Sequence, residues 1–250
     1  MRYKVSIIGY LAKQKPLYDG QTVKTKQMIS VLYDHLSGDE IGGLDMQGMR
    51  RSPVSFFWNF FKLCRNSDNV IILPAHGSLL LFPLLCILFR GKDTKLVYDV
   101  IGGWLSGYIE KYSYLKAILK RFDQIWVETT VMKKALEEKG FNNLTVVPNF
   151  KNLYILKEEE LNMEISLPIR LCVFSRITEM KGIDDAVKSV TETTNTDSSF
   201  FSLDIYGQID SSYTEHFSEL QKHFPENIRY CGCVDASKST EVLREYDALM

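Results

Sequence analysis

The stretch Leu171–Asp184, LCVFSRITEMKGID, decides the fold. It begins with Leu171–Phe174, a short apolar run of the kind that forms a buried strand. Ile183, Val187 and Val190 then follow at the i, i+4, i+7 spacing of a helix. The stretch therefore predicts a strand that turns directly into a helix, which is the repeating unit of an α/β fold.

Two basic residues, Arg176 and Lys181, lie in the turn between this strand and helix. The start of a helix favours an anion, and Asp184 or its neighbour can cap it. A guanidinium binds phosphate oxygens through two parallel bonds and an ammonium acts as a point charge. The turn thus suits a nucleotide-sugar diphosphate. In an arbitrary loop the same residues are more often solvated charges, so the rest of the chain must decide.

Composition limits the class of protein. The chain has 250 residues, of which 45% are hydrophobic and 24% charged, and its formal net charge is −1. These values are typical of a soluble globular protein with one large domain or two modest ones. The charge balance predicts no nucleic-acid partner.

The five cysteines are odd in number and lie mostly in apolar runs, which predicts reduced, buried thiols in a cytoplasmic chain. Cys231 and Cys233 are interpreted as strand residues. The start of the chain leads straight into a short strand, so we expect no signal peptide. Ser78–Phe89, the most apolar segment, is shorter than the roughly 20 residues that a membrane-spanning helix needs.

Short apolar runs alternate with helical patterns along the chain, which predicts a parallel sheet covered by helices on both faces. One helix is expected after Gly20 and another between Thr129 and Gly140. An acid-rich stretch predicts a domain boundary near Ser166, hence domains 1–165 and 166–250. The expected strands are Lys4–Ile8, Val70–Leu73, Lys95–Asp99, Gln124–Val127, Leu144–Val147, Arg170–Phe174, Phe201–Tyr206 and Ile228–Cys231.

Several motifs together resemble one enzyme family. SRITEMKG (175–182) resembles the arginine and lysine-glycine loop of retaining family-four glycosyltransferases, including bacterial capsule and exopolysaccharide enzymes. YDGQTVKT (18–25) is similar to the family's glycine loop, and VPN (147–149) to the end of its first domain. The resemblance implies the GT-B fold, with two Rossmann-like, doubly wound parallel-sheet domains.

The resemblance also implies roles for individual residues. Relatives often carry a cleft histidine where Ile101 stands here, so that role does not transfer, and Asp99 is the remaining polar candidate. We expect Asp99 to be exposed to the acceptor. No metal cofactor is expected. The candidates are Asp99, Arg176 and Lys181 for catalysis; Gly20, Arg176, Lys181 and Gly207 for the donor; and Gln21, Lys24, His76, Gly102, Gly103 and Trp104 for the acceptor.

The sequence departs from the family at its end. The segment Glu245–Met250 resembles the approach to a pair of glutamates that hold the donor in relatives, but no such pair follows. The second domain is therefore expected to be incomplete, and the chain is interpreted as truncated.

Two apolar segments with basic residues admit two interpretations. Ser55–Arg65 and Leu79–Lys92 can form helices that dip into the inner face of a membrane, or helices that pack in the core. Because Leu79–Phe89 is apolar all round, core packing is favoured for it, whereas both interpretations stay open for the first segment.

The expected function is transfer of a sugar from a nucleotide diphosphate sugar to a lipid-linked or other saccharide acceptor, at the cytoplasmic face of a bacterial membrane. Two alternatives stay open. One is an epimerase or phosphorylase on the same fold. The other is a non-catalytic chain that binds a partner or a membrane.

Overall fold

The computed structural model describes residues 2–12, 20–150, 155, 157–160, 166–194, 200–235 and 238–250. The chain divides into two compact units, Met1–Asn152 and Leu153–Met250. Each unit is described by itself below. The expected boundary at Ser166 stays a prediction.

The first unit is built on a six-stranded sheet in which every neighbouring pair of strands is parallel. Its strands, in spatial order, are β2 (Ile41–Asp45), β1 (Tyr3–Gly9), β3 (Ser67–Ile72), β4 (Lys95–Asp99), β5 (Gln124–Val127) and β6 (Leu144–Val146).

Strand β2 was not predicted, because its sequence, IGGLD, has two glycines and reads as a turn. Packing explains the first of them. A Cβ at Gly42 would lie 2.1 Å from the Ser6 hydroxyl oxygen on β1 and 2.8 Å from Leu63. Glycine is therefore required for the strand to approach its neighbours this closely.

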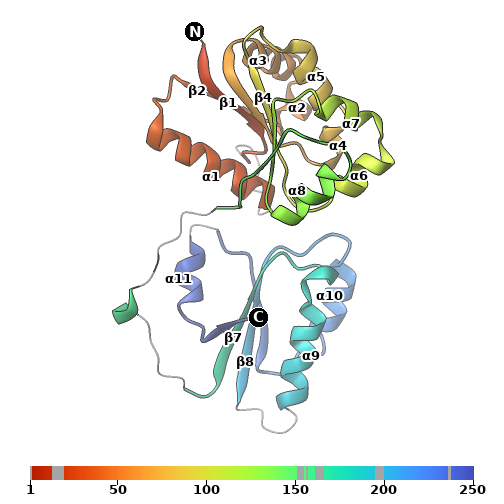
Figure 1. Cartoon of the computed structure of the whole chain (residues 1–250). Helices are drawn as coiled ribbons and strands as arrows, with labels where there is room; N and C mark the ends of the chain where they lie inside the picture. The colour runs from red at the N-terminus through yellow and green to blue at the C-terminus, as the bar shows by residue number, and fades with distance from the viewer. Residues whose placement is uncertain are drawn as a thin grey trace. The chain divides into compact units, whose positions relative to one another are not determined.

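Helices cover both faces of this sheet (Figure 1). Helix α1 (Gly20–His35) packs Met28 against one face, on Ile7 and Ile71. The other face carries the larger core, into which five helices bury their apolar sides. They are α3 (Pro53–Arg65), α5 (Phe82–Phe89), α6 (Leu105–Lys111), α7 (Tyr114–Leu119) and α8 (Thr130–Glu137). The short helix α2 (Gly48–Arg51) precedes α3, and the short helix α4 (His76–Leu79) precedes α5.

Helix α8 begins where the sequence predicts. The Thr129 hydroxyl accepts a hydrogen bond of 3.2 Å from the backbone N–H of Met132, and this bond satisfies one of the free donors of the first turn. Gly140 follows the helix with a φ of 79°.

Helix α5 differs from the expectation. Cys86 and Phe82 are buried, but Leu88 is 64% exposed and Leu84 is 37% exposed. The favoured core packing of Leu79–Phe89 is therefore confirmed for one side of the helix only, and the other side is exposed.

The second unit has a four-stranded parallel sheet. In Figure 1, α9 (Ile183–Thr194) and α10 (Thr214–Gln221) lie on one face and α11 (Ser239–Leu243) on the other. Ile183, Val187 and Val190 all lie in the core under α9, as their spacing predicts. The strands, in spatial order, are β10 (Ala248–Leu249), β7 (Ile169–Phe174), β8 (Phe201–Tyr206) and β9 (Ile228–Gly232), with 3-10 turns at Glu158–Glu160 and Glu179–Lys181.

In each sheet, the first strand in the sequence has later strands on both of its sides, so the direction of strand order reverses there. In the first unit β2 and β3 flank β1, and in the second unit β10 and β8 flank β7. Open parallel sheets bind ligands beyond the carboxyl ends of the strands at such switch points. All eight predicted strands are confirmed to within three residues at each end, and so is the α/β parallel class.

The cysteines follow the prediction in part. Cys64, Cys86 and Cys172 are buried and free, whereas Cys231 and Cys233 are free but exposed. Cys231 lies in β9, and Cys233 follows that strand, so only the first is a strand residue.

Candidate functional site

A buried ion pair lies at the carboxyl end of β4 in the first unit. The Lys24 Nζ of α1 lies 2.8 Å from Oδ1 of Asp99, the last residue of β4. Their side chains are 1% and 0% exposed. The expectation that Asp99 is exposed is therefore wrong, because α1 packs over the end of the strand and brings a lysine with it. Its catalytic role stays a prediction, as does the role of Lys24 at the acceptor.

Glu128 completes this cluster and was not predicted from the sequence. It directly follows β5, and its Oε1 lies 3.5 Å from the Lys24 Nζ. Its Oε2 accepts a hydrogen bond of 3.1 Å from the backbone N–H of Gly102. A polar residue immediately after a buried strand is the signal that could have found it. Glu128 thus joins α1 to the loop that follows β4.

The surroundings of Asp99 favour its neutral, protonated form more than water would. Burial, with a smaller contribution from the nearby Glu128 carboxylate, raises the pKa of Asp99 to about 6 against the opposing effect of Lys24. Asp99 Oδ2 is buried and has no hydrogen-bond partner in the described part of the chain.

The loop after β4 carries three predicted acceptor residues. Gly102 has a φ of 77°, a backbone conformation that favours glycine, and Gly103 is exposed. The Trp104 indole N–H donates a hydrogen bond of 2.6 Å to the Ile101 carbonyl, and its ring packs edge-on against Tyr108. The loop is therefore a defined turn that holds a half-buried indole.

The start of α1 lies at the β1/β3 switch point. The Gln21 amide donates a hydrogen bond to the carbonyl of Leu73, which directly follows β3. A Cβ at Gly9, the last residue of β1, would come within 3.1 Å of Thr25 on this helix. Gly20 is exposed, and a Cβ there would meet no described atom within 4 Å, so packing does not require glycine at this position.

Two predicted features lie outside the described residues in whole or in part. Tyr18 and Asp19, in the predicted glycine loop, are not described. The backbone of His76 begins α4, but its side chain is not described. The acceptor role of His76 stays a prediction.

In the second unit, Arg176 lies in the loop after β7, at the β7/β10 switch point. This loop runs beside the loop after β8, because Ile177 and Ile209 form a parallel bridge and Ile177 is fully buried. The pairing brings the Arg176 Nη2 to 2.5 Å from Asp210 Oδ2. Hydrogen bonds from Ser212, more than the charge of Arg176, keep the pKa of Asp210 below its usual value. The Arg176 side chain is 52% exposed and can reach a ligand.

Lys181 ends the 3-10 turn before α9 and is exposed. Gly182 follows with a φ of 68°, the left-handed conformation that lets the chain turn into the helix. The next residues, Asp184 and Asp185, put two carboxylates in the first turn of α9. These compete with any anion for the positive end of the helix, so Arg176 and Lys181 must supply most of the attraction.

Asp184, in the first turn of α9, contacts two side chains from α10 and the residue before it. Its carboxylate accepts a hydrogen bond from the Tyr213 hydroxyl and lies 2.8 Å from His216 Nε2. Although burial opposes the shift, these contacts lower its pKa. The residue therefore joins α9 to α10.

Gly207 is the most constrained of the predicted donor residues. Its φ is 146°, and a Cβ there would lie 1.7 Å from the carbonyl oxygen of Ser175. Its N–H donates to Gly232 and its carbonyl accepts from the Tyr230 hydroxyl. Only glycine lets the end of β8 pass this close to the loop that carries Arg176.

A second polar network, not predicted, lies on the sheet face opposite α9. Arg229 on β9 makes a bidentate pair with Asp204 on β8, at 2.8 and 2.9 Å. The Tyr246 hydroxyl donates to Asp204 at 2.8 Å and lies 2.8 Å from the Tyr206 hydroxyl. The network joins the segment before β10 to the centre of the sheet.

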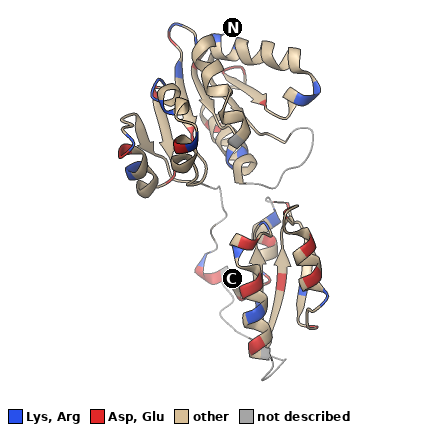
Figure 2. Ribbon diagram, turned by 90° about the vertical axis from the view of Figure 1, so that its right-hand side faces the viewer, with Lys and Arg blue, Asp and Glu red and all other residues tan. Residues whose placement is uncertain are grey.

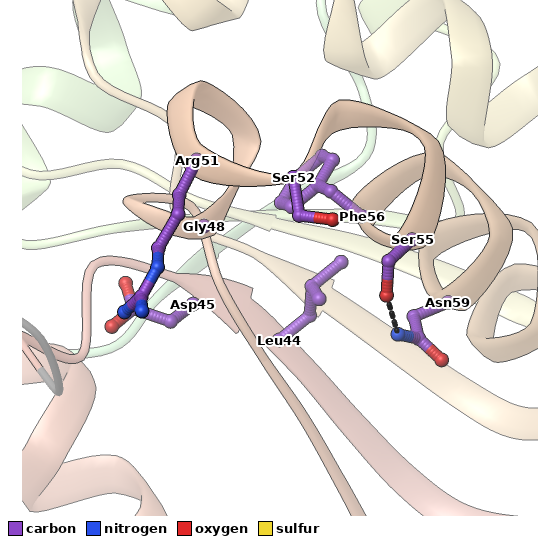
Figure 3. A pocket seen from close by; sticks show the side chains of 8 residues that line it. All are labelled: Leu44, Asp45, Gly48, Arg51, Ser52, Ser55, Phe56 and Asn59. Atoms are coloured by element: carbon purple, nitrogen blue, oxygen red, sulfur yellow. Dashed lines mark hydrogen bonds between the residues drawn. The ribbon is translucent and has the colours of Figure 1, made fainter.

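A pocket of about 230 Å³ lies beside the end of β2 in the first unit, and Figure 3 shows the side chains that line it. The Arg51 side chain extends alongside Asp45, and Ser55 and Asn59 point in from α3. No predicted site residue lines it. The full lining is Leu44, Asp45, Gly48, Arg51, Ser52, Ser55, Phe56 and Asn59.

Among the described residues, no three His, Cys, Asp or Glu side chains are grouped so that they could hold a metal ion. No helix in the described ranges is long and apolar enough to cross a membrane.

No family model and no curated protein matches this sequence. Solved structures do match. They include a point mutant of the Staphylococcus aureus protein TarM with fondaparinux, α-GlcNAc-glycerol and UDP (TM-score 0.56, 14% identity, 77% of this chain and 38% of that chain). Another is the pneumococcal O-GlcNAc transferase GtfA with UDP and GlcNAc (0.55, 19%, 78% and 39%).

A third is an α,α-trehalose-phosphate synthase from Burkholderia xenovorans with glucose-6-phosphate (TM-score 0.62, 11% identity, 100% of this chain and 79% of that chain). At these identities the likeness shows the fold. The chain has the GT-B fold of glycosyltransferases, and it spans less than two fifths of the TarM and GtfA structures.

Proposed function

We propose that this chain is the whole or part of a glycosyltransferase that takes its sugar from a nucleotide diphosphate sugar. The observation that carries the proposal is the position of Arg176. It lies in the loop after β7, at the switch point of a GT-B second sheet, with its guanidinium half exposed. Lys181 is exposed at the end of the same loop.

In the proposed reaction Arg176 and Lys181 stabilise the negative charge that develops on the leaving diphosphate. Preorganised charges of this kind supply a large share of transition-state stabilisation. The Arg176 guanidinium must then exchange Asp210 for phosphate oxygens, or bind both. Transfer with retention of configuration and without a metal cofactor is part of the proposal and follows from the family resemblance.

The loop of Gly102, Gly103 and Trp104, together with Gln21 and His76, forms the proposed acceptor side. An indole ring beside glycine backbone is a surface on which a sugar ring can lie. Lys24 and Asp99 are buried, so their proposed contribution is to hold α1 and this loop in place through Glu128, which accepts the hydrogen bond from Gly102.

A UDP-sugar is the proposed donor, because the TarM and GtfA structures above contain UDP. The proposed acceptor is a lipid-linked saccharide in bacterial surface polysaccharide synthesis. That proposal draws on the family resemblance and implies contact with a membrane.

The test is a thermal-shift screen of the purified chain against UDP, GDP, CMP and TDP sugars, with Arg176→Ala and Lys181→Ala alongside. Lys188→Ala is the matched control, because Lys188 is an exposed lysine of the same unit that pairs with Glu192 on α9. We expect one nucleotide to raise the Tm, and both test substitutions to abolish the shift. A folded chain with no shift from any donor would refute donor binding by this chain.

Product analysis with a labelled donor separates the alternatives. A transferase attaches the label to an added saccharide. An epimerase converts the labelled donor without an acceptor. A phosphorylase, given inorganic phosphate, transfers the labelled sugar to it and releases the nucleoside diphosphate. A binding chain leaves the donor unchanged.

A further inference from the structure

Helix α3 exposes an apolar stripe. Val54 is 84% exposed and Trp58 is 67% exposed. Phe61 is half-buried beside them, and its ring centroid lies 6.1 Å from that of Trp58. Residues 54, 58 and 61 are spaced i, i+4, i+7, so they share one side of the helix. That side ends in exposed Lys62 and Arg65.

The stripe continues onto α5. Leu84 and Leu88 are 37% and 64% exposed, and Leu81, which directly precedes the helix, is 45% exposed. The two helices are in direct contact, because the Phe61 and Phe89 rings lie 5.3 Å apart. Both helices bury their opposite sides in the same core cluster, so their exposed sides form one continuous surface, here called the α3–α5 surface.

The segment that carries this surface is biased toward positive charge. Between residues 46 and 92 the sequence has six Lys and Arg residues and a single acid, Asp68. That acid pairs with Arg2. One of the six cations, Arg90, pairs with Asp123. For Lys62 and Arg65, no ion pair is formed with any residue that the structure describes.

The same bias extends to the whole unit, although the net charge of the chain hides it. Residues 1–152 contain 21 Lys and Arg against 13 Asp and Glu, whereas residues 153–250 contain 9 against 18. Figure 2 shows the acidic segments of the second unit along its helices. The first unit therefore has a formal net charge of +8, and the second unit has a formal net charge of −9.

These observations restrict the occupant of the surface. Large exposed apolar patches mark contact sites. A second copy of the α3–α5 surface would set cations against cations with no acid to pair them. An anionic bilayer satisfies both features, because tryptophan and leucine enter the headgroup region while lysine and arginine contact acidic lipids.

We propose that the α3–α5 surface docks the first unit on an anionic phospholipid bilayer. The proposal deepens the lipid-linked acceptor of the proposed function but does not need turnover. Docking would hold the chain at the interface where a lipid-linked acceptor presents its saccharide.

The test is co-sedimentation of the full chain with vesicles of neutral phosphatidylcholine or of phosphatidylcholine with 30% phosphatidylglycerol as probe. We expect binding to the anionic vesicles and at least tenfold weaker binding to the neutral ones. Trp58→Ser with Leu88→Ser should weaken binding about tenfold or more. Lys62→Gln with Arg65→Gln should weaken it severalfold and reduce its salt dependence.

Tyr33→Ser is the matched apolar control, because Tyr33 is 57% exposed on α1, which covers the opposite face of the sheet. Lys133→Gln with Lys134→Gln on α8 is the matched charge control. Both should stay within twofold of the parent, and circular dichroism should confirm that all variants fold.

Equal binding to both vesicle types, no binding, or wild-type binding by the Trp58/Leu88 variant would overturn the proposal. A dimer of the parent chain that is absent in this variant would also overturn the proposal, because the surface would then be a protein–protein interface. The donor thermal shift separates this proposal from the proposed function. Surface variants should keep it, while Arg176→Ala should lose it and still bind vesicles.

Discussion

The ammonium of Lys24 lies 2.8 Å from the carboxylate of Asp99, and water reaches neither side chain. The pair joins the first helix to the end of the fourth strand, 75 residues further along the chain. Taking two charges out of water is costly, and their attraction offsets the cost only while both are present. The pair therefore makes the position of α1 depend on that of the Gly102 loop.

Removing one partner should be worse than removing both. Lys24→Met leaves a buried carboxylate beside Glu128, and we expect the free energy of unfolding to fall by about 3–5 kcal/mol. Lys24→Met with Asp99→Val should recover part of that loss, because of the two carboxylates beside Lys24 only Glu128 then keeps its charge without a cation. Urea unfolding followed by tryptophan fluorescence measures this, since Trp58, Trp104 and Trp126 all lie in the first unit. A single variant as stable as the parent would contradict the argument.

The pH dependence of stability should carry the signature of Asp99. The pKa of Asp99 is about 6 in the folded protein, against an ordinary value of 3.8 that we take for the unfolded chain. Between pH 3.8 and about pH 6 the folded chain therefore binds more protons than the unfolded chain. The contribution of this carboxyl is complete below about pH 4 and is lost as the pH rises through 6. The difference in unfolding free energy between the parent and Asp99→Asn should therefore shrink over that interval. A difference that grows with pH would show that Asp99 titrates low.

The strands could be predicted because apolar runs between polar segments fix where a parallel sheet has its buried strands. Strand β2 could not be predicted, because its Gly42 is required by a close approach to Ser6 that exists only in the folded unit. Arg176 and Gly207 were correctly expected beyond strand ends, since strand order places them there.

Contacts between side chains that are far apart in the sequence could not be predicted from it. Nothing local distinguishes the buried Lys24 from an exposed helix lysine, and the expectation of an exposed Asp99 failed for that reason. Asp210 and Glu128 were likewise missed, because each acquires its meaning from a cation far away in sequence.

Asp210 should restrain the proposed donor site. Asp210→Asn removes the charge that holds Arg176, while the Asn oxygen can still accept the bonds from Ser212. We expect severalfold tighter binding of UDP or the donor sugar, measured by calorimetry. Glu219→Gln is the control, because this exposed carboxylate of α10 pairs with Lys222 and not with Arg176, and it should change affinity less than twofold. Weaker binding in Asp210→Asn would mean that Asp210 positions the guanidinium for the ligand.

Gly207→Ala should disrupt the second unit and leave the first intact. The new methyl would lie 1.7 Å from the Ser175 carbonyl oxygen, which is backbone and cannot rotate away, at a φ that alanine rarely adopts. We expect a loss of at least about 3 kcal/mol, or local unfolding of β8, seen as faster amide exchange in that strand.

Gly232→Ala is the matched control for that variant. Gly232 also has a positive φ, 82°, but a Cβ there would meet no described atom within 4 Å, so its cost should be the backbone strain alone, about 1–2 kcal/mol. The tryptophan-detected unfolding transition should stay unchanged in both variants, because all three tryptophans belong to the first unit. Equal losses for the two variants would show that the strand end relaxes around the methyl. In that case the close approach of Gly207 to the Arg176 loop would not be a requirement of the fold.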